Sequence, residues 1–469
     1  MTILTKAAGA IALLCTLAGC GPAPTPAAQN PTGALQGIWK SDGYGFVLVA
    51  TGDSLLAFEV TETTCVPSFK AVRRTETPPG AEAAYEADRE VLAVMAGPDS
   101  SQKHLKSAGA ASYMVIRRLA ARPAVCDQPT PNTPAGNFEV FAATWAEHYI
   151  LFDQKGADWQ GVVATARAKV TPTTTPEQLF DIMQGMIAPF EDAHTFISAD
   201  SIKRSFHLLR KGTDRIAKGG MADFRTKDLP GILAVTDRKL TGALRTWCND
   251  QVQYGHVDDS TGYLRILSES GYAKTGGFAA GLVALEAALD TIFTDPKLTG
   301  LVIDVRINFG GADPYGLALA ARLAGSEYLA YSKEARIDPA DRTKWTPGQP
   351  STVRPSSRPG FRGPVVELMG PITISAGETT TQALMGRIPK IVRIGENTQG
   401  VFSDVLGRRL PNGWNFGLPN EVFRTANGKT FDGPGIPPDV QVPVFADQDL
   451  KSGRDPGLAR AVAELRARP

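Results

Sequence analysis

Alternating apolar strands and amphipathic helices between residues 262 and 394 constrain the fold of this chain more than any other feature. The segments follow one another in the order 263–267 (strand), 278–293 (helix), 301–305 (strand), 314–323 (helix), 365–369 (strand), 376 onward (helix) and 391–394 (strand). Strands separated by helices of this length pair in parallel, with the helices crossing over the faces of the sheet. The sequence therefore predicts an α/β core, within a chain of α+β multidomain organisation.

Two regions of different pattern precede this core. Residues 34–128 are β-rich, with strand-like runs at 45–50 and 55–60 separated by Thr51-Gly52-Asp53, a hairpin signal. They predict a small β-sandwich or barrel. Beyond a Pro-rich break, apolar and aromatic residues recur every three or four positions, which predicts a helical subdomain over residues 135–199. Its second helix is expected to begin after Thr175, with Gln178 completing a capping box.

The remaining boundaries follow from the loss of periodicity. Residues 200–261 show no sustained pattern and are interpreted as a variable linker or lid. The core is placed at residues 262–445, and residues 446–469 are expected to form a C-terminal helical tail. A length of 469 residues exceeds what one hydrophobic core usually supports, which agrees with several domains.

The N-terminus has the layout of a secretory signal over residues 1–20, with Lys6 before a short apolar stretch. Its last residues, Leu17-Ala18-Gly19-Cys20, resemble a bacterial lipobox, which implies lipidation of Cys20. The Pro-rich residues 21–33 then form a flexible tether. Gly21 rather than Asp after the cysteine favours the outer membrane by the lipoprotein sorting rule. The expected location is the periplasm, lipid-anchored; the alternative is an ordinary signal peptide with an incidental cysteine.

The net charge and the cysteine content limit the classes of partner and cofactor to be expected. The chain has 49 basic and 48 acidic residues, so no excess charge steers it to nucleic acid. An oxidising periplasm favours a disulfide between Cys65 and Cys126 and leaves Cys248 as a buried thiol. The cysteines are isolated and the five histidines scattered, so neither a metal nor another cofactor is expected.

Ser375 lies at a predicted strand-to-helix turn, in Ser375-Ala376-Gly377-Glu378. A hydroxyl beside the free N–H groups of a helix N-terminus suits acyl transfer, because those groups can hold the oxyanion that forms. The alternative is an ordinary helix N-cap. A second turn, Gly310-Gly311, follows the strand at 301–305 and would let backbone N–H groups face a bound group.

Four motifs follow one another in a fixed order along the chain: Asp304-x-Arg306-x-Asn308-x-Gly310-Gly311, Ser375-Ala376-Gly377-Glu378, Gly395-Glu396-x-Thr398-x-Gly400 and Gly435-Ile436-x-Pro438-Asp439. Together they resemble the tail-specific, or C-terminal processing, serine peptidase family over residues 137–445. The resemblance implies a core of ClpP/crotonase-like β-α-β units. It also implies that Ser375 is the nucleophile of a peptidase working through an acyl-enzyme.

Two branches of that family differ in the base. One uses a lysine directly after the last glycine of the third motif, where this chain has Val401, which cannot take a proton. The other resembles the tricorn core and uses a histidine in an Asp-x-His-Thr segment, matched by Asp192-Ala193-His194-Thr195. The resemblance therefore implies His194 as general base. The alternative is a core histidine at a turn.

The residue predicted as the catalytic acid departs further from the family pattern than the predicted base does. The branch carries a glutamate where this chain has Asp432, which is one methylene shorter, and a relay serine where it has Ala193. The imidazolium could be stabilised in three ways: by direct contact between Asp432 and His194, through a bridging water, or by another carboxylate such as Asp192. The oxyanion hole is expected from the N–H of Ala376 with that of Gly310 or Gly311, and Glu378 is expected to support the turn.

These inferences predict a lipid-anchored serine endopeptidase that acts on peptides or proteins and touches the bilayer only through its acyl anchor. No PDZ domain is evident, so recognition of free C-termini is not implied. Two alternatives stay open at this point. The chain is a non-catalytic binding lipoprotein that retains the peptidase fold, or the N-terminal β-domain is the functional module and the rest a scaffold.

Overall fold

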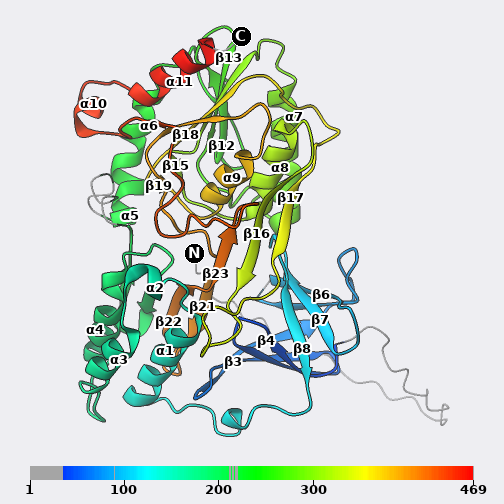
Figure 1. Ribbon diagram of the computed structural model, residues 1–469, viewed down its shortest axis with the longest axis vertical. Helices are drawn as coiled ribbons and strands as arrows, with labels where there is room; N and C mark the ends of the chain where they lie inside the picture. The colour runs from blue at the N-terminus through cyan, green and yellow to red at the C-terminus, as the bar shows by residue number, and fades with distance from the viewer. Residues whose placement is uncertain (1–34, 89, 211–212, 214–215, 217–219, 468–469) are drawn as a thin grey trace, which may run out of the picture.

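The computed structural model describes residues 35–467, apart from residues 89, 211–212, 214–215 and 217–219. The predicted signal, the tether and the lipidation site Cys20 lie outside the described residues. Three regions are arranged around the middle of the molecule (Figure 1). A strand-built barrel and a group of helices lie side by side at one end, and the larger α/β core forms the other end.

The N-terminal region is a closed eight-stranded barrel in which the last strand pairs with the first. Trp39, Leu55, Tyr85 and Ile116 fill its interior. The strands are β1 (Gly37–Ser41), β2 (Phe46–Thr51), β3 (Ser54–Val60), β4 (Cys65–Arg73), β5 (Ala83–Ala87), β6 (Glu90–Ala96), β7 (Gln102–Ser107) and β8 (Met114–Leu119). The sequence predicts a small sandwich or barrel, and the pairing of β1 with β8 shows that the region is a barrel.

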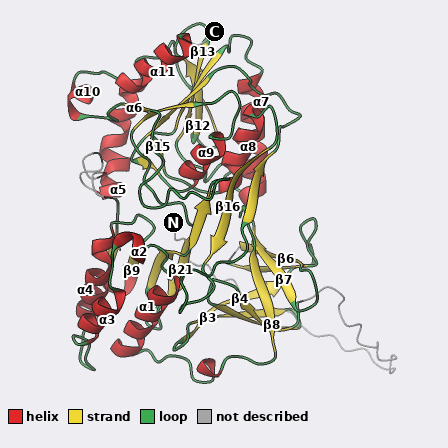
Figure 2. Ribbon diagram, in the orientation of Figure 1, coloured by secondary structure: helices red, strands yellow, loops and turns green. Residues whose placement is uncertain are grey.

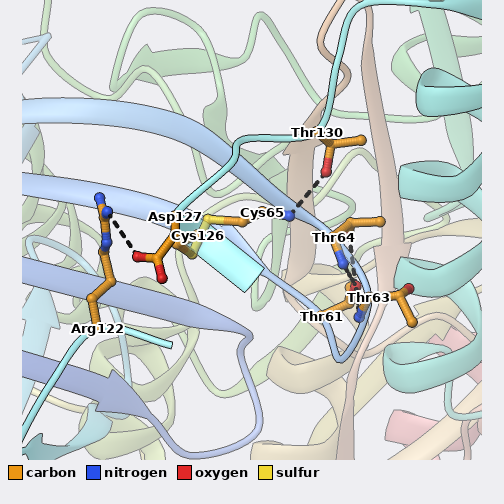
Figure 3. Close-up of a disulfide and its surroundings, with 8 residues drawn as sticks. All are labelled: Thr61, Thr63, Thr64, Cys65, Arg122, Cys126, Asp127 and Thr130. Carbon is orange, nitrogen blue, oxygen red and sulfur yellow. Dashed lines mark hydrogen bonds and ion pairs between the residues drawn. A yellow bond between two sulfur atoms is a disulfide. The ribbon is translucent and has the colours of Figure 1, made fainter. Parts of the chain in front are cut away.

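A disulfide ties the end of this region to its fourth strand (Figure 3). Cys65 begins β4, and Cys126 ends a short 3-10 turn, Ala124–Cys126, beyond the barrel. The Cys65 N–H donates to the hydroxyl of Thr130 at 3.0 Å. The segment that leaves the barrel is therefore fastened to it just before the helices begin.

The helical subdomain is built around an aromatic cluster that includes Trp145, Tyr149, Trp159 and Phe190. Its helices are α1 (Pro134–His148), α2 (Phe152–Lys155), α3 (Trp159–Arg167) and α4 (Pro176–Ile187), followed by the 3-10 turn Ala188–Phe190. The α4 helix starts with the expected capping box of Thr175 and Gln178. A sheet in the order β10-β9-β22-β21 covers these helices, with strands β9 (Phe196–Ala199), β10 (Arg204–His207), β21 (Val405–Arg409) and β22 (Asn415–Pro419). The first two strands follow the 135–199 helices and the last two come from far along the chain.

The core is a seven-stranded sheet in the order β11-β12-β13-β14-β18-β20-β24. The strands are β11 (Arg245–Trp247), β12 (Val252–His256), β13 (Thr261–Ile266), β14 (Gly300–Asp304), β18 (Val365–Met369), β20 (Val392–Gly395) and β24 (Val440–Gln441). From β13 to β24 neighbouring strands run parallel. The sheet starts before residue 262, where the sequence placed the core boundary, because β11 and β12 add to it as antiparallel strands.

Helices cover both faces of this sheet (Figure 2). Leu301 and Ile303 of β14 pack with the helices on one face, and Val302 between them packs with the helix on the other. The first face carries α7 (Gly277–Phe293), α8 (Asp313–Leu323) and α9 (Ala376–Leu384), and the second carries α11 (Pro456–Arg466). Burial on both faces explains why these strands read as continuous apolar runs.

The other elements connect the regions. A three-stranded sheet of β17 (Gln349–Val353), β16 (Tyr328–Ala335) and β23 (Glu421–Arg424) runs from the core toward the barrel, and β15 (Ile307–Asn308) pairs with β19 (Ile372–Thr373) beside the site described below. The 200–261 interval supplies α5 (Gly220–Asp223), a π-helical turn (Phe224–Asp228) and α6 (Leu229–Asp237), and α10 (Asp447–Lys451) precedes α11. Over the described residues, no helix combines the length and apolarity that a membrane crossing requires.

Candidate active site

Ser375 lies between β19 and α9 in a backbone conformation that non-glycine residues rarely adopt, with φ +56° and ψ −118°. Such a conformation costs on the order of 1–3 kcal/mol and persists only where the surroundings enforce it. The Ser375 N–H donates to Glu378 at 3.3 Å, while the side chain is only half-buried. The turn therefore presents a serine hydroxyl at the start of a helix whose other residues are buried.

Glu378 joins this turn to a second loop. Its fully buried carboxylate also accepts the N–H groups of Gly400 at 2.6 Å and Val401 at 2.8 Å. Burial raises the pKa of Glu378 to about 7. Three backbone donors thus converge on one carboxylate, which supports the expected role of Glu378 in holding the turn.

The glycine loop packs directly against the serine. A Cβ added at Gly310, where φ is +72°, would stand 2.7 Å from the Ser375 Cβ, so only glycine fits this approach. Its N–H is already donated to the Asn308 Oδ1 at 2.9 Å. Among the described residues, no hydrogen bond occupies the N–H of Gly311 or Ala376. Of the three donors expected for the oxyanion hole, these two are the ones left available.

A buried ion network braces this loop from behind. The Arg306 guanidinium bonds Asp304 at 2.6 Å and Asp455 at 2.7 Å, and all three side chains are almost inaccessible. Asp455 also caps the N-terminus of α11 by accepting the N–H of Leu458. The C-terminal helix is therefore fastened to the strand end that carries Gly310 and Gly311, and Asp304 and Arg306 serve as a structural brace there.

His194 follows the helical subdomain and is buried, with 7% of its surface exposed. The neighbouring Ala193 packs on an apolar cluster that contains Ile374 and Val401, which brings this segment to the nucleophile's turn. Burial lowers the pKa of His194, and the charges of Asp192 and Asp404 and the carbonyl of Ser403 partly oppose that change. The imidazole therefore favours its neutral, proton-accepting form.

The structure does not join Asp432 to His194 by a hydrogen bond among the described residues. The Asp432 carboxylate instead accepts the N–H of Phe402 at 3.1 Å and the hydroxyl of Thr430 at 2.9 Å. Burial raises the pKa of Asp432 to about 7. His194 Nδ1 is buried without a hydrogen-bond partner in the described structure. The aspartate is one methylene shorter than a glutamate, and backbone groups engage it.

Asp192 is the carboxylate that acts most strongly on His194. Its Oδ1 accepts the backbone N–H of His194 at 2.9 Å, and its Oδ2 accepts the Tyr149 hydroxyl at 3.2 Å. Of the charges that favour the protonated imidazole, that of Asp192 is the largest. From the sequence, Asp192 is only an alternative to Asp432 as the catalytic acid.

Residues 400–404 form a segment that contacts the serine turn, the histidine and the predicted acid. Gly400 and Val401 bond Glu378, Phe402 bonds Asp432, Ser403 faces the His194 ring, and Asp404 pairs with Lys333. This one segment therefore sets the positions of the serine turn, the histidine and the predicted acid relative to one another.

Sequence reasoning missed a buried charge cluster next to this segment. Lys333 of β16 pairs with Asp404 and with Glu421 of β23, and the Tyr44 hydroxyl of the barrel donates to Glu421 at 2.5 Å. No local motif marks these residues, because they come from three distant parts of the chain. The signal available from sequence was a lysine in a strand that is otherwise apolar on its buried face.

The interval interpreted as a linker or lid covers one side of the site. Phe224 and Ile232, from the π-helical turn and α6, belong to the same apolar cluster as Ile374 and Val401. Arg225 stacks over Phe309 of the glycine loop at 4.0 Å. These helices are thus packed onto the loops around Ser375.

Comparisons with known proteins find a family match and similar folds. Residues 260–442 match the family model of peptidase family S41. A candidate peptidase from Parabacteroides merdae ATCC 43184 shares the fold with 24% identity and a TM-score of 0.60, over 72% of this chain and 98% of that one. Mature CPAF aligns with 12% identity and a TM-score of 0.52, over 71% of this chain and 96% of the other. No curated protein sequence matches the chain.

Proposed function

We propose that the chain is a serine endopeptidase of peptidase family S41, whose family model matches residues 260–442, and that Ser375 is the nucleophile and His194 the general base. The observation that carries the proposal is the 400–404 segment, which holds the serine turn through Glu378 and faces the imidazole through Ser403. A fold that only bound ligands would not require a strained serine beside two available N–H groups and a neutral buried histidine.

In the proposed reaction, the Ser375 hydroxyl attacks the carbonyl carbon of the scissile peptide bond while His194 takes its proton. The N–H groups of Gly311 and Ala376 hold the oxyanion; one such donor contributes about 3–4 kcal/mol in a serine protease. The imidazolium then gives its proton to the leaving amine. Water, deprotonated by the same histidine, hydrolyses the acyl-enzyme and restores Ser375.

Asp192 supplies the negative charge that stabilises the imidazolium in this proposal. It lies two residues before His194, bonds that residue's backbone, and is held by Tyr149. Asp432 orders the 400–404 segment through Phe402 and supports the base indirectly. The role of the acid is thereby divided between a carboxylate that acts through its charge and one that acts through the backbone.

A fluorophosphonate probe tests the nucleophile directly, because it reacts with activated serines. We expect wild-type protein to be labelled at Ser375, Ser375→Ala not to be labelled, and His194→Gln to be labelled much more slowly. Ser205→Ala, at an exposed serine of β10 away from these contacts, serves as the control and should be labelled like wild type. Equal labelling of wild type and Ser375→Ala, or none of either, would refute the proposal.

We also propose that Cys20 is lipidated and that the protein is anchored in the periplasm at the outer membrane. The Cys65–Cys126 disulfide supports an oxidising compartment, since such bonds are rare in the cytosol. Detergent-phase partitioning of protein expressed with its leader, followed by mass spectrometry of the N-terminal peptide, tests the anchor. Cys20→Ser is expected to shift the protein to the aqueous phase.

A further inference from the structure

A pocket of about 290 Å³ opens beside the glycine loop. Gly311 and Ala312 form one edge of it, and residues 269–273, which follow β13, form another. Gly310 packs on Ser375, so the pocket begins one residue from the nucleophile's contact. Gly311 also carries one of the two N–H groups assigned to the oxyanion.

The floor of the pocket is aromatic. Tyr315 of α8 stacks on Tyr272 with ring centroids 4.4 Å apart and on Phe278 of α7 at 4.8 Å. The Tyr315 hydroxyl is used by the Phe278 carbonyl oxygen at 3.1 Å. The three rings are therefore fixed in place by stacking, and the Tyr315 hydroxyl is not a free polar group for an occupant.

The N-terminal barrel supplies the opposite wall. Ala108 and Gly109, in the turn between β7 and β8, line the pocket, and a Cβ added at Gly109 would come within 3.0 Å of Phe278. The same hairpin is fastened to the core by Gln349, whose side chain accepts the Tyr113 N–H at 2.9 Å and donates to the Tyr113 carbonyl at 2.7 Å. The turn between β7 and β8 of the barrel therefore contacts the core at this pocket.

The pocket does not offer a charge to its occupant. Glu269 is the one acidic or basic side chain among the described residues that line it, and it is fully buried. Its Oε1 accepts from Asn308 and Thr380, and its Oε2 is buried with no hydrogen-bond partner among the described residues. Burial raises the pKa of Glu269 to about 7, which further reduces its charge.

We propose that this pocket binds an apolar or aromatic substrate side chain, that of the residue whose carbonyl Ser375 attacks, and that the barrel thereby takes part in substrate selection. The proposal rests on the proposed peptidase function. It assigns the N-terminal domain a role in the reaction at the core.

Diphenyl phosphonate probes bearing a phenylalanine, leucine, alanine or lysine side chain test this selection, because they attach to an activated serine with loss of phenol. Wild-type protein is expected to react about tenfold faster with the phenylalanine and leucine probes than with the alanine and lysine probes. Ala108→Trp fills the pocket from an exposed position and is expected to lower the phenylalanine-to-alanine rate ratio about fivefold or more. Ala96→Trp, an exposed barrel position outside the lining, is the control and should behave like wild type.

Phe278→Ala widens the same pocket and provides a second variant, expected to increase reaction with side chains bulkier than phenylalanine. Labelling by a fluorophosphonate without a side chain should stay within about twofold of wild type in each variant, because Ser375 is untouched. A preference for lysine, or an unchanged ratio in both Ala108→Trp and Phe278→Ala with Ser375 still labelled, overturns the pocket assignment alone. Absence of fluorophosphonate labelling in wild type overturns the peptidase proposal and the pocket assignment with it.

Discussion

The nucleophile and the base of this site are held in different ways. Ser375 sits in a strained turn whose N–H, together with those of Gly400 and Val401, is anchored on Glu378. His194 comes from another region of the chain, and its buried Nδ1 has no hydrogen-bond partner in the described structure. Local hydrogen bonds define the serine, whereas packing and nearby charges define the histidine.

This difference has a chemical meaning. The serine must stand at a fixed distance from the oxyanion donors, so its turn requires geometric precision. The histidine must change charge during the reaction, and its pKa depends on burial, on the charges of Asp192 and Asp404 and on the Ser403 carbonyl. We therefore expect changes at the serine to act through geometry and changes near the histidine to act through its pKa.

The largest expected effect is at the nucleophile itself. Ser375→Ala should lower peptidase activity by about 10⁴-fold or more, because no other group can form the acyl-enzyme. Thermal unfolding should remain close to that of wild type, since the side chain is half-buried and its removal leaves the Glu378 contacts intact. Residual activity within tenfold of wild type would place the chemistry elsewhere.

The brace behind the glycine loop is expected to matter for stability. Asp455→Ala leaves Arg306 buried with one partner fewer and removes the cap of α11, which should cost about 3–5 kcal/mol in the free energy of unfolding. Arg460→Ala, in an exposed pair with Glu464 on the same helix, should cost about 0.5 kcal/mol or less. Urea unfolding measures both; similar costs would show that the network does not brace the loop.

A pair of isosteric substitutions separates the two carboxylates near the base. Asp192→Asn should lower kcat/KM by about 10–100-fold, because the imidazolium loses the largest charge that favours it. Asp432→Asn should change kcat/KM by less than about threefold, since its contacts are to the backbone of Phe402 and to Thr430. The reverse ranking, measured on folded protein of equal concentration, would make Asp432 the catalytic acid.

The strain at the nucleophile's turn predicts a smaller effect. Ser375→Gly should be more stable than Ser375→Ala by about 1 kcal/mol, because glycine adopts φ +56° without a steric penalty. Comparing the two inactive variants removes any contribution of the hydroxyl. A difference of zero or of opposite sign in their melting curves would mean that the turn is not strained.

The pH dependence of activity tests whether the pKa of His194 controls the reaction. Burial holds the pKa of His194 below its ordinary value, so activity should be lost only as the pH falls through that lowered pKa, below about 6.5. Removing the charge of Asp192 should shift this acidic limb further down, because that charge raises the pKa. The pH at which activity rises is measured by the rate of fluorophosphonate labelling as a function of pH. A rate that rises only above about pH 9 would indicate a lysine base.

Much of the core could be predicted from the sequence. The strand at 365–369 and the capped helix after Thr175 were placed at the bounds that the structure shows, since their patterns and caps are local. The start of the sheet was placed too late. The strands Arg245–Trp247 and Val252–His256 are short and of mixed polarity; the second pairs with Thr261–Ile266 and the first adds to it at the edge of the sheet, so tertiary pairing supplies what their pattern lacks.

The serine turn, the glycine loop and the absence of a lysine at position 401 follow from the sequence alone, because each is a contiguous motif in which neighbouring residues specify the backbone. Three other features depend on the folded chain: which donors remain for the oxyanion, which carboxylate acts on His194, and where the barrel meets the core. Those depend on contacts between segments up to several hundred residues apart. A side chain such as Gln349, which holds the barrel's hairpin at Tyr113, has no local pattern that announces its partner.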